Sequence, residues 1–243
     1  MSTFKPKEFK NIKAFYDRNG YAIVENMISE TICDEIKKES LKFSEPPDYP
    51  VVLNIHRKSD FFFSLISNKK IVEIVKFVQG SDIDAVNDQF LYKIKNTKYG
   101  KQSWTLHQDN SYPRAEYGAY LVVHVAVDKS TKENGGLIFY EGSHKEDILD
   151  FENNISWKEN YTTNKITEPG QTIKNKSVIN KYKKKDVIFP KGSICLMHGN
   201  LIHASYPNFS SEFDRNQYSM CYLKRNVEFN VGKNSPRIRK ELY

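Results

Sequence analysis

The sequence predicts a mainly β fold with a helical layer at its N-terminus. Helix-like apolar spacing is confined to residues 1–83. From residue 84 to 225, short runs rich in Val, Ile, Tyr and Phe recur between turn residues, as in antiparallel sheets. Eight such runs favour a closed or double-sheet architecture, of which the jelly roll is the standard eight-stranded case. The 243 residues fit one domain, in which residues 226–243 form a C-terminal tail.

The helical layer is predicted from apolar spacing and from residues that begin or end helices. Apolar residues recur at helical intervals within Pro6–Asp17, and an Asn-Gly pair follows as a stop signal. A second helix is predicted over Ser29–Phe43, where the first residue can cap it and prolines after residue 45 end it. A third covers Asn68–Val78. We expect residues 1–83 to support and cover the β core.

The predicted strands are separated by Gly, Asn, Asp and Pro. They are Asp88–Lys95, Trp104–Asp109, Gly118–Asp128, Leu137–Tyr140, Asp186–Phe189, Ser193–His198, His203–Tyr206 and Gln217–Lys224. Residues 142–185 are polar and are predicted to be a loop insertion. A loop of this length in a compact domain is usually functional or disordered.

Bulk properties restrict the class of protein. The net charge is +7 and the pI is about 9.0, but the only dense basic run is Lys181–Lys185. No nucleic-acid motif accompanies that run, so we expect a solvated loop or mild steering of an anionic substrate. No stretch approaches the roughly 20 apolar residues of a membrane span, and the N-terminus lacks a secretory signal. Three cysteines without metal-type spacing (Cys33, Cys195 and Cys221) favour a reduced cytoplasm.

Three residues from two distant stretches suggest a metal site. His107 and Asp109 are two apart on a predicted strand, so their side chains leave the same face. His203 begins another predicted strand, which a barrel can bring beside the first. Two imidazoles and one carboxylate on one face hold ferrous iron and leave positions open for oxygen and substrates. His-x-Asp by itself is a weak pattern, and a solvated turn explains most instances.

The surrounding motifs strengthen this interpretation. Four motifs occur in fixed order, with Arg215 after them: Leu106–Tyr112 (LHQDNSY), Glu133–Leu137 (ENGGL), Tyr140–Lys145 (YEGSHK) and His198–Ser205 (HGNLIHAS). From about Val86 to Leu223 the chain resembles the phytanoyl-CoA dioxygenase family of iron(II)- and 2-oxoglutarate-dependent oxygenases. The resemblance implies a double-stranded β-helix core (a cupin-like jelly roll) with iron at its mouth. It also implies that His107, Asp109 and His203 are the iron ligands.

The resemblance further implies a site for the cosubstrate 2-oxoglutarate. Arg215 lies twelve residues after His203, where the family places a basic residue that holds the distal carboxylate. A guanidinium can pair bidentately with a carboxylate and stays charged, although an arginine in such a loop is otherwise a surface residue. Ser205 shares the strand face of His203, and the family's matching hydroxyl binds the same carboxylate. Gln89 falls where relatives contact the cosubstrate; a half-exposed strand glutamine is an equal alternative.

His124 stands where many relatives carry a tryptophan beside the cosubstrate. Alternation divides its strand into an apolar face and a second face that contains His124. The first face is Leu121, Val123, Val125 and Val127, and the second is Tyr120, Val122, His124 and Ala126. We therefore expect His124 to line the cosubstrate cavity without binding iron. His144 and His198 have simpler interpretations, as a residue that fixes its turn and as a buried, hydrogen-bonded histidine.

The expected activity is 2-oxoglutarate-dependent hydroxylation of a small molecule, with O2 consumed and succinate and CO2 released. Halogenating relatives lack the iron-binding carboxylate, so Asp109 favours hydroxylation; desaturation or cyclisation uses the same ligands. Arg114 and His56–Lys58 favour an anionic or zwitterionic substrate, and His56 itself lies in a region that covers the active-site mouth in relatives. Two alternatives from other classes are a non-catalytic metal-binding jelly roll and a nucleic-acid-binding protein that uses Lys181–Lys185.

Overall fold

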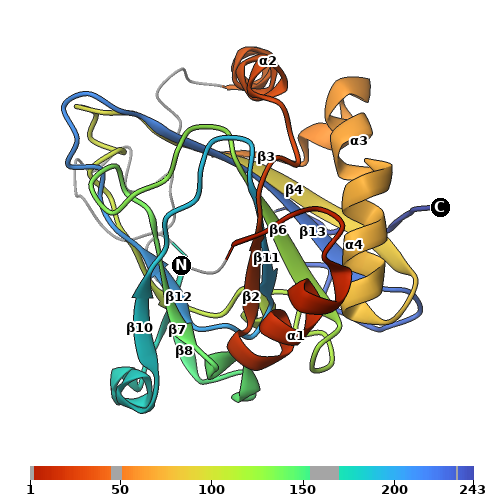
Figure 1. The fold of residues 1–243 in the computed structure, drawn as a ribbon. Coiled ribbons are helices and arrows are strands. Elements are labelled where there is room, and N and C mark those ends of the chain that lie inside the picture. The colour runs from red at the N-terminus through yellow and green to blue at the C-terminus, as the bar shows by residue number, and fades with distance from the viewer. Residues whose placement is uncertain (1–2, 45–50, 154–169, 234) are drawn as a thin grey trace.

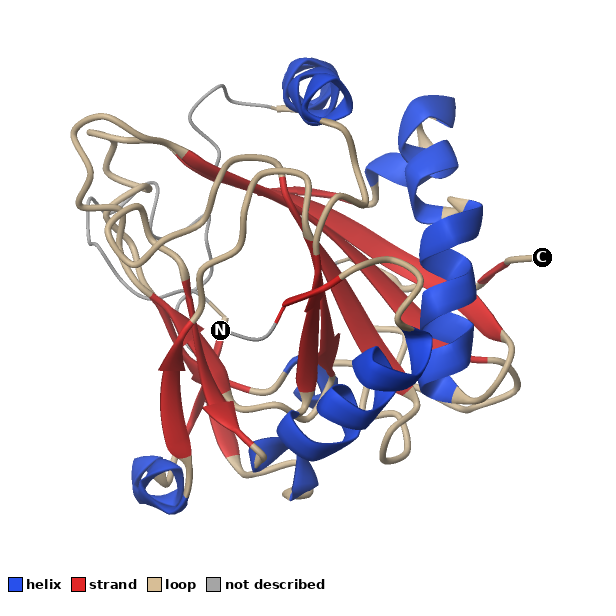
Figure 2. Ribbon diagram, viewed as in Figure 1, coloured by secondary structure: helices blue, strands red, loops and turns tan. Residues whose placement is uncertain are grey.

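The computed structural model describes residues 3–44, 51–153, 170–233 and 235–243. Two sheets face each other, and helices cover the outer side of the larger one (Figures 1 and 2). The four helices are α1 (Phe9–Asn19), α2 (Glu30–Ser40), α3 (Asp60–Ile66) and α4 (Lys69–Gln79). Short 3-10 turns occupy Leu41–Phe43, Ile55–Arg57, Asp109–Ser111, Ser143–Lys145 and Lys176–Lys181. This arrangement confirms the predicted jelly-roll class of fold.

The larger sheet is ordered β1-β2-β11-β6-β13-β4-β14, and β3 also pairs with β4. Its strands are β1 (Thr3–Phe4), β2 (Tyr21–Val24), β3 (Val51–Leu53), β4 (Ile83–Lys93), β6 (Tyr120–Ala126), β11 (Ile194–His198), β13 (Arg215–Lys224) and β14 (Lys240–Glu241). The smaller sheet is ordered β10-β7-β12-β5, with β5 (Trp104–His107), β7 (Leu137–Glu141), β10 (Lys183–Asp186) and β12 (His203–Ser205). A separate pair joins β8 (Phe151–Asn153) to β9 (Gln171–Ile173).

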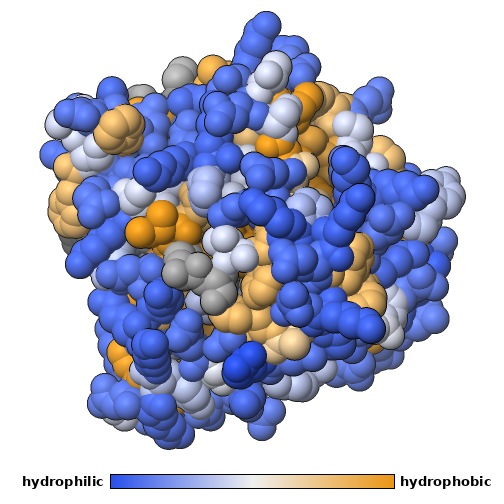
Figure 3. Space-filling view, in the orientation of Figure 1, coloured by the Kyte–Doolittle hydropathy of each residue, from blue (hydrophilic) through white to orange (hydrophobic). Residues whose placement is uncertain are grey.

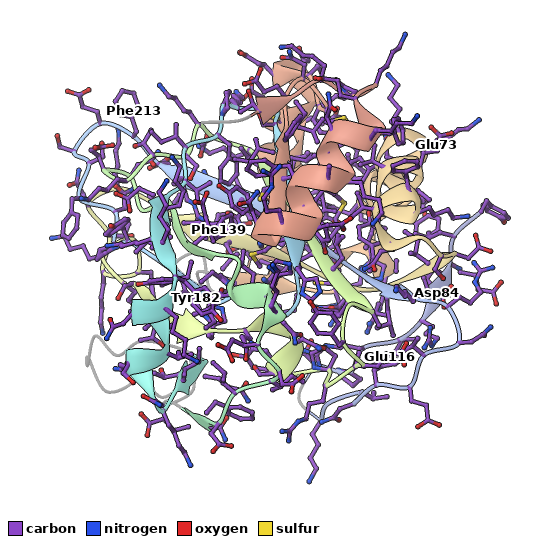
Figure 4. All side chains as sticks on the ribbon, turned by 60° about the horizontal axis from the view of Figure 1, so that its bottom comes forward. Glu73, Asp84, Glu116, Phe139, Tyr182 and Phe213 are labelled. Carbon is purple, nitrogen blue, oxygen red and sulfur yellow. The ribbon has the colours of Figure 1, made fainter. Side chains whose placement is uncertain are left out.

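Alternation along β6 separates two hydrophobic cores, as the sequence predicts. Leu121, Val123 and Val125 pack with the helices on the outer side of the large sheet. Val122 and Ala126 belong to the core that the two sheets share. In that inner core the ring centroid of Phe139, which Figure 4 labels, lies 4.7 Å from that of Tyr21. His124 shares its strand face with the inner group, so it points between the sheets.

The ends of the predicted helices are close to the observed ones because local signals set them. Ser29 accepts a hydrogen bond from Ile32 N at the start of α2, and Asn68 caps α4. Gly20 ends α1 with φ +85°, a conformation that glycine adopts without a steric penalty.

The N-terminal region also contains elements that the sequence did not predict. Helix α3 begins after Ser59, whose hydroxyl accepts from Phe62 N. Strand β2 is a fully buried run of four apolar residues, and such a short run has no period that identifies a strand. Because β2 pairs with β11, residues 1–83 are part of the large sheet as well as a cover for it.

Two predictions about residues 142–189 are wrong. The predicted strand Asp186–Phe189 is replaced by β10, which starts at Lys183 and pairs with β7. The lysines of β10 lie on an edge of the smaller sheet, where lysine discourages pairing with another chain. The predicted loop insertion contains β8, β9, two 3-10 turns and the start of β10, although residues 154–169 lie outside the described part of the chain.

The C-terminal segment returns to the large sheet. Ile238 N donates to Val86 O at 3.1 Å, and β14 then pairs with the start of β4. Asp84, labelled in Figure 4, accepts from the guanidinium of Arg239 at 2.7 Å and from that of Arg225 at 3.1 Å. The described residues of 226–243 thus form more than a tail, because they pair with the large sheet.

The surface turned to the viewer in Figure 3 is mostly hydrophilic, with apolar side chains in small separate patches. Among the helices that the structure describes, none is both long and apolar enough to span a membrane.

Candidate metal and cosubstrate site

His107, Asp109 and His203 converge between the two sheets. Nε2 of His107 lies 3.4 Å from Oδ1 of Asp109, and Nε2 of His203 lies 3.7 Å from the same oxygen. One donor atom from each residue can be chosen so that all three lie within 4.8 Å of one another. This is the spacing of ligands around one ion, and it is the only such group of three among the described residues.

Strand pairing accounts for the position of the two histidines. His203 on β12 is directly opposite His107 on β5 in an antiparallel pair, and their ring centroids are 4.1 Å apart. In each ring Nδ1 donates to the carbonyl two residues earlier: to Thr105 O at 2.7 Å and to Leu201 O at 3.0 Å. These bonds fix the tautomer, so that Nε2 carries the lone pair for a metal.

Asp109 reaches the site by a different route from the predicted one. Strand β5 ends at His107, and Asp109 begins a 3-10 turn that continues to Ser111. The position of this carboxylate therefore does not follow from the alternation of side chains along a strand. The three donor atoms nevertheless lie close together. Gln108 keeps the intervening backbone extended, and its side-chain amide donates to Asn200 O at 2.9 Å.

The electrostatics of the three residues suit metal binding. Burial lowers the pKa of His203 to about 4, and the neighbouring His107 adds to the shift, so the ring is neutral near pH 7. Burial opposes ionisation of Asp109, but the His203 and His107 rings outweigh it and hold the pKa of this carboxyl below its usual range. The site therefore offers two imidazole nitrogens and one carboxylate, which is the donor set of non-haem ferrous sites.

The three donors open into a cavity of about 450 Å³ between the sheets, a size suited to small molecules. Its walls come from both sheets and from the C-terminal segment. The aromatic and apolar lining residues include Trp104, Tyr112, Tyr120, Leu137 and Leu91. The predicted cosubstrate residues Gln89, His124, Ser205 and Arg215 all line this same cavity.

Arg215 is buried at the start of β13 and is linked to His124 through Gln217. Arg215 Nη2 donates to Gln217 Oε1 at 2.6 Å, and Gln217 Nε2 lies 2.8 Å from His124 Nδ1. Because a guanidinium can only donate, the amide oxygen must face Arg215 and the amide nitrogen must face His124. Nδ1 of His124 is then an acceptor, and the proton of the neutral ring is on Nε2.

The cavity therefore contains three buried nitrogen donors that the described residues leave without a hydrogen-bond partner: Nε2 of His124, Nε of Arg215 and Nε of Arg237. Burial lowers the pKa of His124 to about 3, so the ring stays neutral, whereas Arg215, with its pKa lowered to about 10, stays charged. A buried cation without a carboxylate is costly. A dicarboxylate ligand would supply the missing acceptors.

Ser205 is held by a lysine that the sequence analysis missed. Lys93 Nζ donates to Ser205 Oγ at 2.8 Å, and Trp104 N approaches the same oxygen at 3.3 Å. Since Oγ already accepts from two donors, its own proton is free to donate into the cavity. Lys93 pairs with Arg215 across β4 and β13, and burial together with the nearby guanidinium lowers the pKa of Lys93 well below its usual value. A lysine within the otherwise apolar run Phe90–Ile94 was the signal that could have revealed it.

Gln89 lies opposite Ser219 in the β4–β13 pair and is partly exposed to the cavity. The arrangement brings Gln89 to the cavity, and its role there stays a prediction.

The residues predicted to favour an anionic substrate lie elsewhere. His56 is buried and contacts Asp88, with 2.9 Å between Nδ1 and Oδ1, and it does not line the cavity. The Arg57 guanidinium donates to Val86 O, and Lys58 lines a separate surface pocket. Arg114 is exposed, with its guanidinium 5.7 Å from the ring of Phe151. The cationic residues of the cavity wall are instead Arg215, Lys233 and Arg237.

The remaining histidines and cysteines are structural. His144 Nε2 lies 3.2 Å from Asp17 O, and His198 Nδ1 accepts from Asn200 N at 3.0 Å. The three cysteines are buried and free of disulfides. Burial raises the pKa of Cys221, which borders the cavity, to about 12.

Comparisons with known proteins identify the family of the chain and agree with its fold. The family model for phytanoyl-CoA dioxygenase (PhyH) matches residues 16–216. A Caenorhabditis elegans homologue of phytanoyl-CoA dioxygenase domain-containing protein 1 is 24% identical over 88% of this chain and 91% of its own. The carbocyclase SnoK from nogalamycin biosynthesis superposes with a TM-score of 0.76 at 17% identity, covering all of this chain and 98% of its own. EctD from S. alaskensis, solved with 2-oxoglutarate and 5-hydroxyectoine, gives 0.71 at 18% identity, with coverage of 100% and 87%.

Proposed function

We propose, since the chain belongs to the phytanoyl-CoA dioxygenase family of iron(II)- and 2-oxoglutarate-dependent oxygenases, that it hydroxylates an unactivated carbon of a small anionic or zwitterionic molecule. His107, Asp109 and His203 would hold the iron. Arg215, Ser205, His124 and Gln89 would bind the 2-oxoglutarate.

One observation supports the proposal most strongly. A single cavity contains both a two-histidine, one-carboxylate donor set and a buried arginine with no ion pair among the described residues. The first part binds a divalent metal, and the second binds a carboxylate. A purely structural metal site has no need of the second part. The coincidence therefore favours catalysis over a non-catalytic metal-binding jelly roll.

When bound, iron and 2-oxoglutarate supply the oxidising chemistry, in which O2 is consumed and succinate and CO2 are released. The chain's own residues position the reactants. Asp109 contributes one negative charge to the metal site, and Arg215 with the Ser205 hydroxyl would orient the distal carboxylate. Trp104, Tyr112 and Tyr120 supply an apolar wall that limits the access of water to the reacting carbon.

Two related reactions use the same ligands. Desaturation and cyclisation differ from hydroxylation in the fate of the substrate after hydrogen has been removed, and SnoK is described as a carbocyclase. The retained carboxylate of Asp109 favours hydroxylation over halogenation and does not separate these two alternatives. Product analysis by mass spectrometry distinguishes them, because hydroxylation adds an oxygen atom and the other two reactions remove hydrogen.

The direct test is an anaerobic titration of the Fe(II)-loaded protein with 2-oxoglutarate. We expect a visible absorption band that saturates with cosubstrate, followed by succinate formation when air and a substrate are admitted. A protein that binds iron but develops no band with 2-oxoglutarate would instead be a non-catalytic metal-binding module. Binding to oligonucleotides is measured in parallel, and salt-sensitive binding would support the alternative of a nucleic-acid-binding protein.

A further inference from the structure

A second arginine, Arg237, lines the cavity from the C-terminal segment. We propose that Arg237 binds the anionic group of the substrate, a carboxylate, phosphate or phosphonate. This inference rests on the proposed function and names one residue that binds the charged group of the substrate. The cavity would then hold two anions, with 2-oxoglutarate on Arg215 and the substrate on Arg237.

The backbone of the C-terminal segment aims Arg237 inward. Ile238 N donates to Val86 O, and two residues later Lys240 pairs with Ala85. Side chains alternate along such an extended segment, so Ile238 turns outward and is 55% exposed. Arg237 and Arg239 leave on the opposite side. Asn54 Nδ2 also donates to Ser235 Oγ at 2.6 Å and ties the segment to the chain before α3.

Arg237 differs from its neighbours in lacking a carboxylate. Arg225 and Arg239 share Asp84 and also donate to main-chain carbonyls. Within the described residues Arg237 has no ion pair, and its Nε is shielded from solvent without a hydrogen-bond partner. A shielded guanidinium donor that lacks an acceptor is costly, and a bidentate oxyanion would satisfy it.

The position of Arg237 fits a molecule that reaches the metal. Its guanidinium lies 6.0 Å from the ring centroid of Tyr112. Tyr112 comes directly after the turn that begins at Asp109, and its N–H is 3.3 Å from Asp109 O. An anion on Arg237 would therefore place the rest of the substrate along the Tyr112 side of the metal site.

Two features assign the substrate to Arg237 and the cosubstrate to Arg215. Arg215 is fully buried and bonded to Gln217, whereas Arg237 is partly exposed, and its segment also brings the exposed Lys233 to the cavity wall. Asp109, which serves the metal, is the one acidic side chain among the described lining residues. The remaining charge of the wall is positive and favours an anion.

The test uses full-length protein loaded with Fe(II) and 2-oxoglutarate. The probes are amino acids, hydroxy acids and phosphonates, each paired with its uncharged ester or amide. Anaerobic shifts of the absorption band report binding, and succinate release in air reports turnover. We expect wild type to respond to anionic members and not to their neutral partners. Arg237→Gln should lower the affinity for the best anionic compound roughly 10- to 100-fold, as for loss of a charge-assisted hydrogen bond. Arg237→Lys should retain part of that affinity.

Controls separate this inference from the proposed function. Lys240→Gln removes one charge from the outer side of the same segment and should leave substrate binding within about twofold of wild type. The 2-oxoglutarate titration of Arg237→Gln should match wild type, which also shows that the variant is folded. No band in wild type refutes the proposed function. Two results overturn the assignment to Arg237. The first is a normal absorption band in wild type together with no anionic compound that binds wild type more tightly than Arg237→Gln. The second is a loss of substrate affinity in Lys240→Gln equal to that in Arg237→Gln.

Discussion

Arg215 and His124 are joined through the two ends of one amide, because Gln217 accepts from the guanidinium and turns its nitrogen toward the imidazole. The always-charged residue thereby sets the tautomer of the neutral one, leaving His124 Nε2–H as a donor toward the cavity. A guanidinium that can pair with a carboxylate and a second donor are thus oriented together toward the cavity.

The Gln217→Glu substitution should break this arrangement. A glutamate would pair with Arg215 and neutralise it, and it could not donate to His124 Nδ1. We expect 2-oxoglutarate affinity to fall by roughly tenfold or more, which corresponds to about 1.4 kcal/mol, while iron binding is retained. Anaerobic titration of the absorption band measures both. An unchanged cosubstrate affinity would show that the linkage is structural only.

Removal of one iron-binding imidazole should abolish the metal site. His107→Ala leaves two donors, and we expect iron affinity to fall by at least about 100-fold, an order of magnitude known even for changes beside metal ligands. The fold should survive, as judged by circular dichroism. His144→Ala is the matched control, since that ring bonds to the α1 backbone outside the cavity. Equal iron loss in both variants would argue against His107 as a ligand.

Arg215→Ala should separate cosubstrate binding from metal binding. Loss of the charged hydrogen bonds should weaken 2-oxoglutarate by roughly 10- to 100-fold, with iron affinity unchanged by equilibrium titration. Arg225→Ala serves as the comparison, because Arg225 is bonded to Asp84 and Leu242 O and lies away from the cavity wall. A loss confined to Arg225→Ala would mean that the cosubstrate arginine is misassigned.

Acid should destabilise the metal-free protein through its buried histidines. Burial lowers the pKa of His198 to about 3, while the unfolded chain titrates near 6.5. Between these values the unfolded state binds the proton and the folded state does not, so stability falls as pH drops through this window. Each such histidine changes the free energy of unfolding by up to about 1.4 kcal/mol per pH unit within this window. Urea unfolding from pH 7 to 4 measures the slope, and His198→Gln should reduce it by that amount; an unaltered slope would contradict the assignment.

Local patterns determined much of this protein. The capping serine of α2, the asparagine of α4 and the glycine after α1 marked helix ends, because capping is an interaction between near neighbours. Alternation along β6 predicted that His124 faces inward, since side-chain direction in a strand follows sequence parity. The motifs around His107 and His203 indicated the family and the three candidate ligands.

Other features depend on contacts between residues far apart in the chain. The strand assignment for Asp109 was wrong because a 3-10 turn, packed against the segment 199–200, ends β5 at His107. The composition of the lysine-rich run favours a loop, but residues Lys183–Asp186 form strand β10 because they pair with β7.

The residues proposed to contact the substrate were also beyond local reasoning. His56–Lys58 looked suitable by charge, but the fold turns His56 toward Asp88 and away from the cavity. Arg237 looked like an ordinary basic residue of a tail until its segment paired beside β4 and directed it inward. The sequence alone therefore determined which chemistry the chain can perform, through residue types at short spacing. Only the tertiary structure decided which charges face the cavity, because that depends on strand pairing across more than a hundred residues.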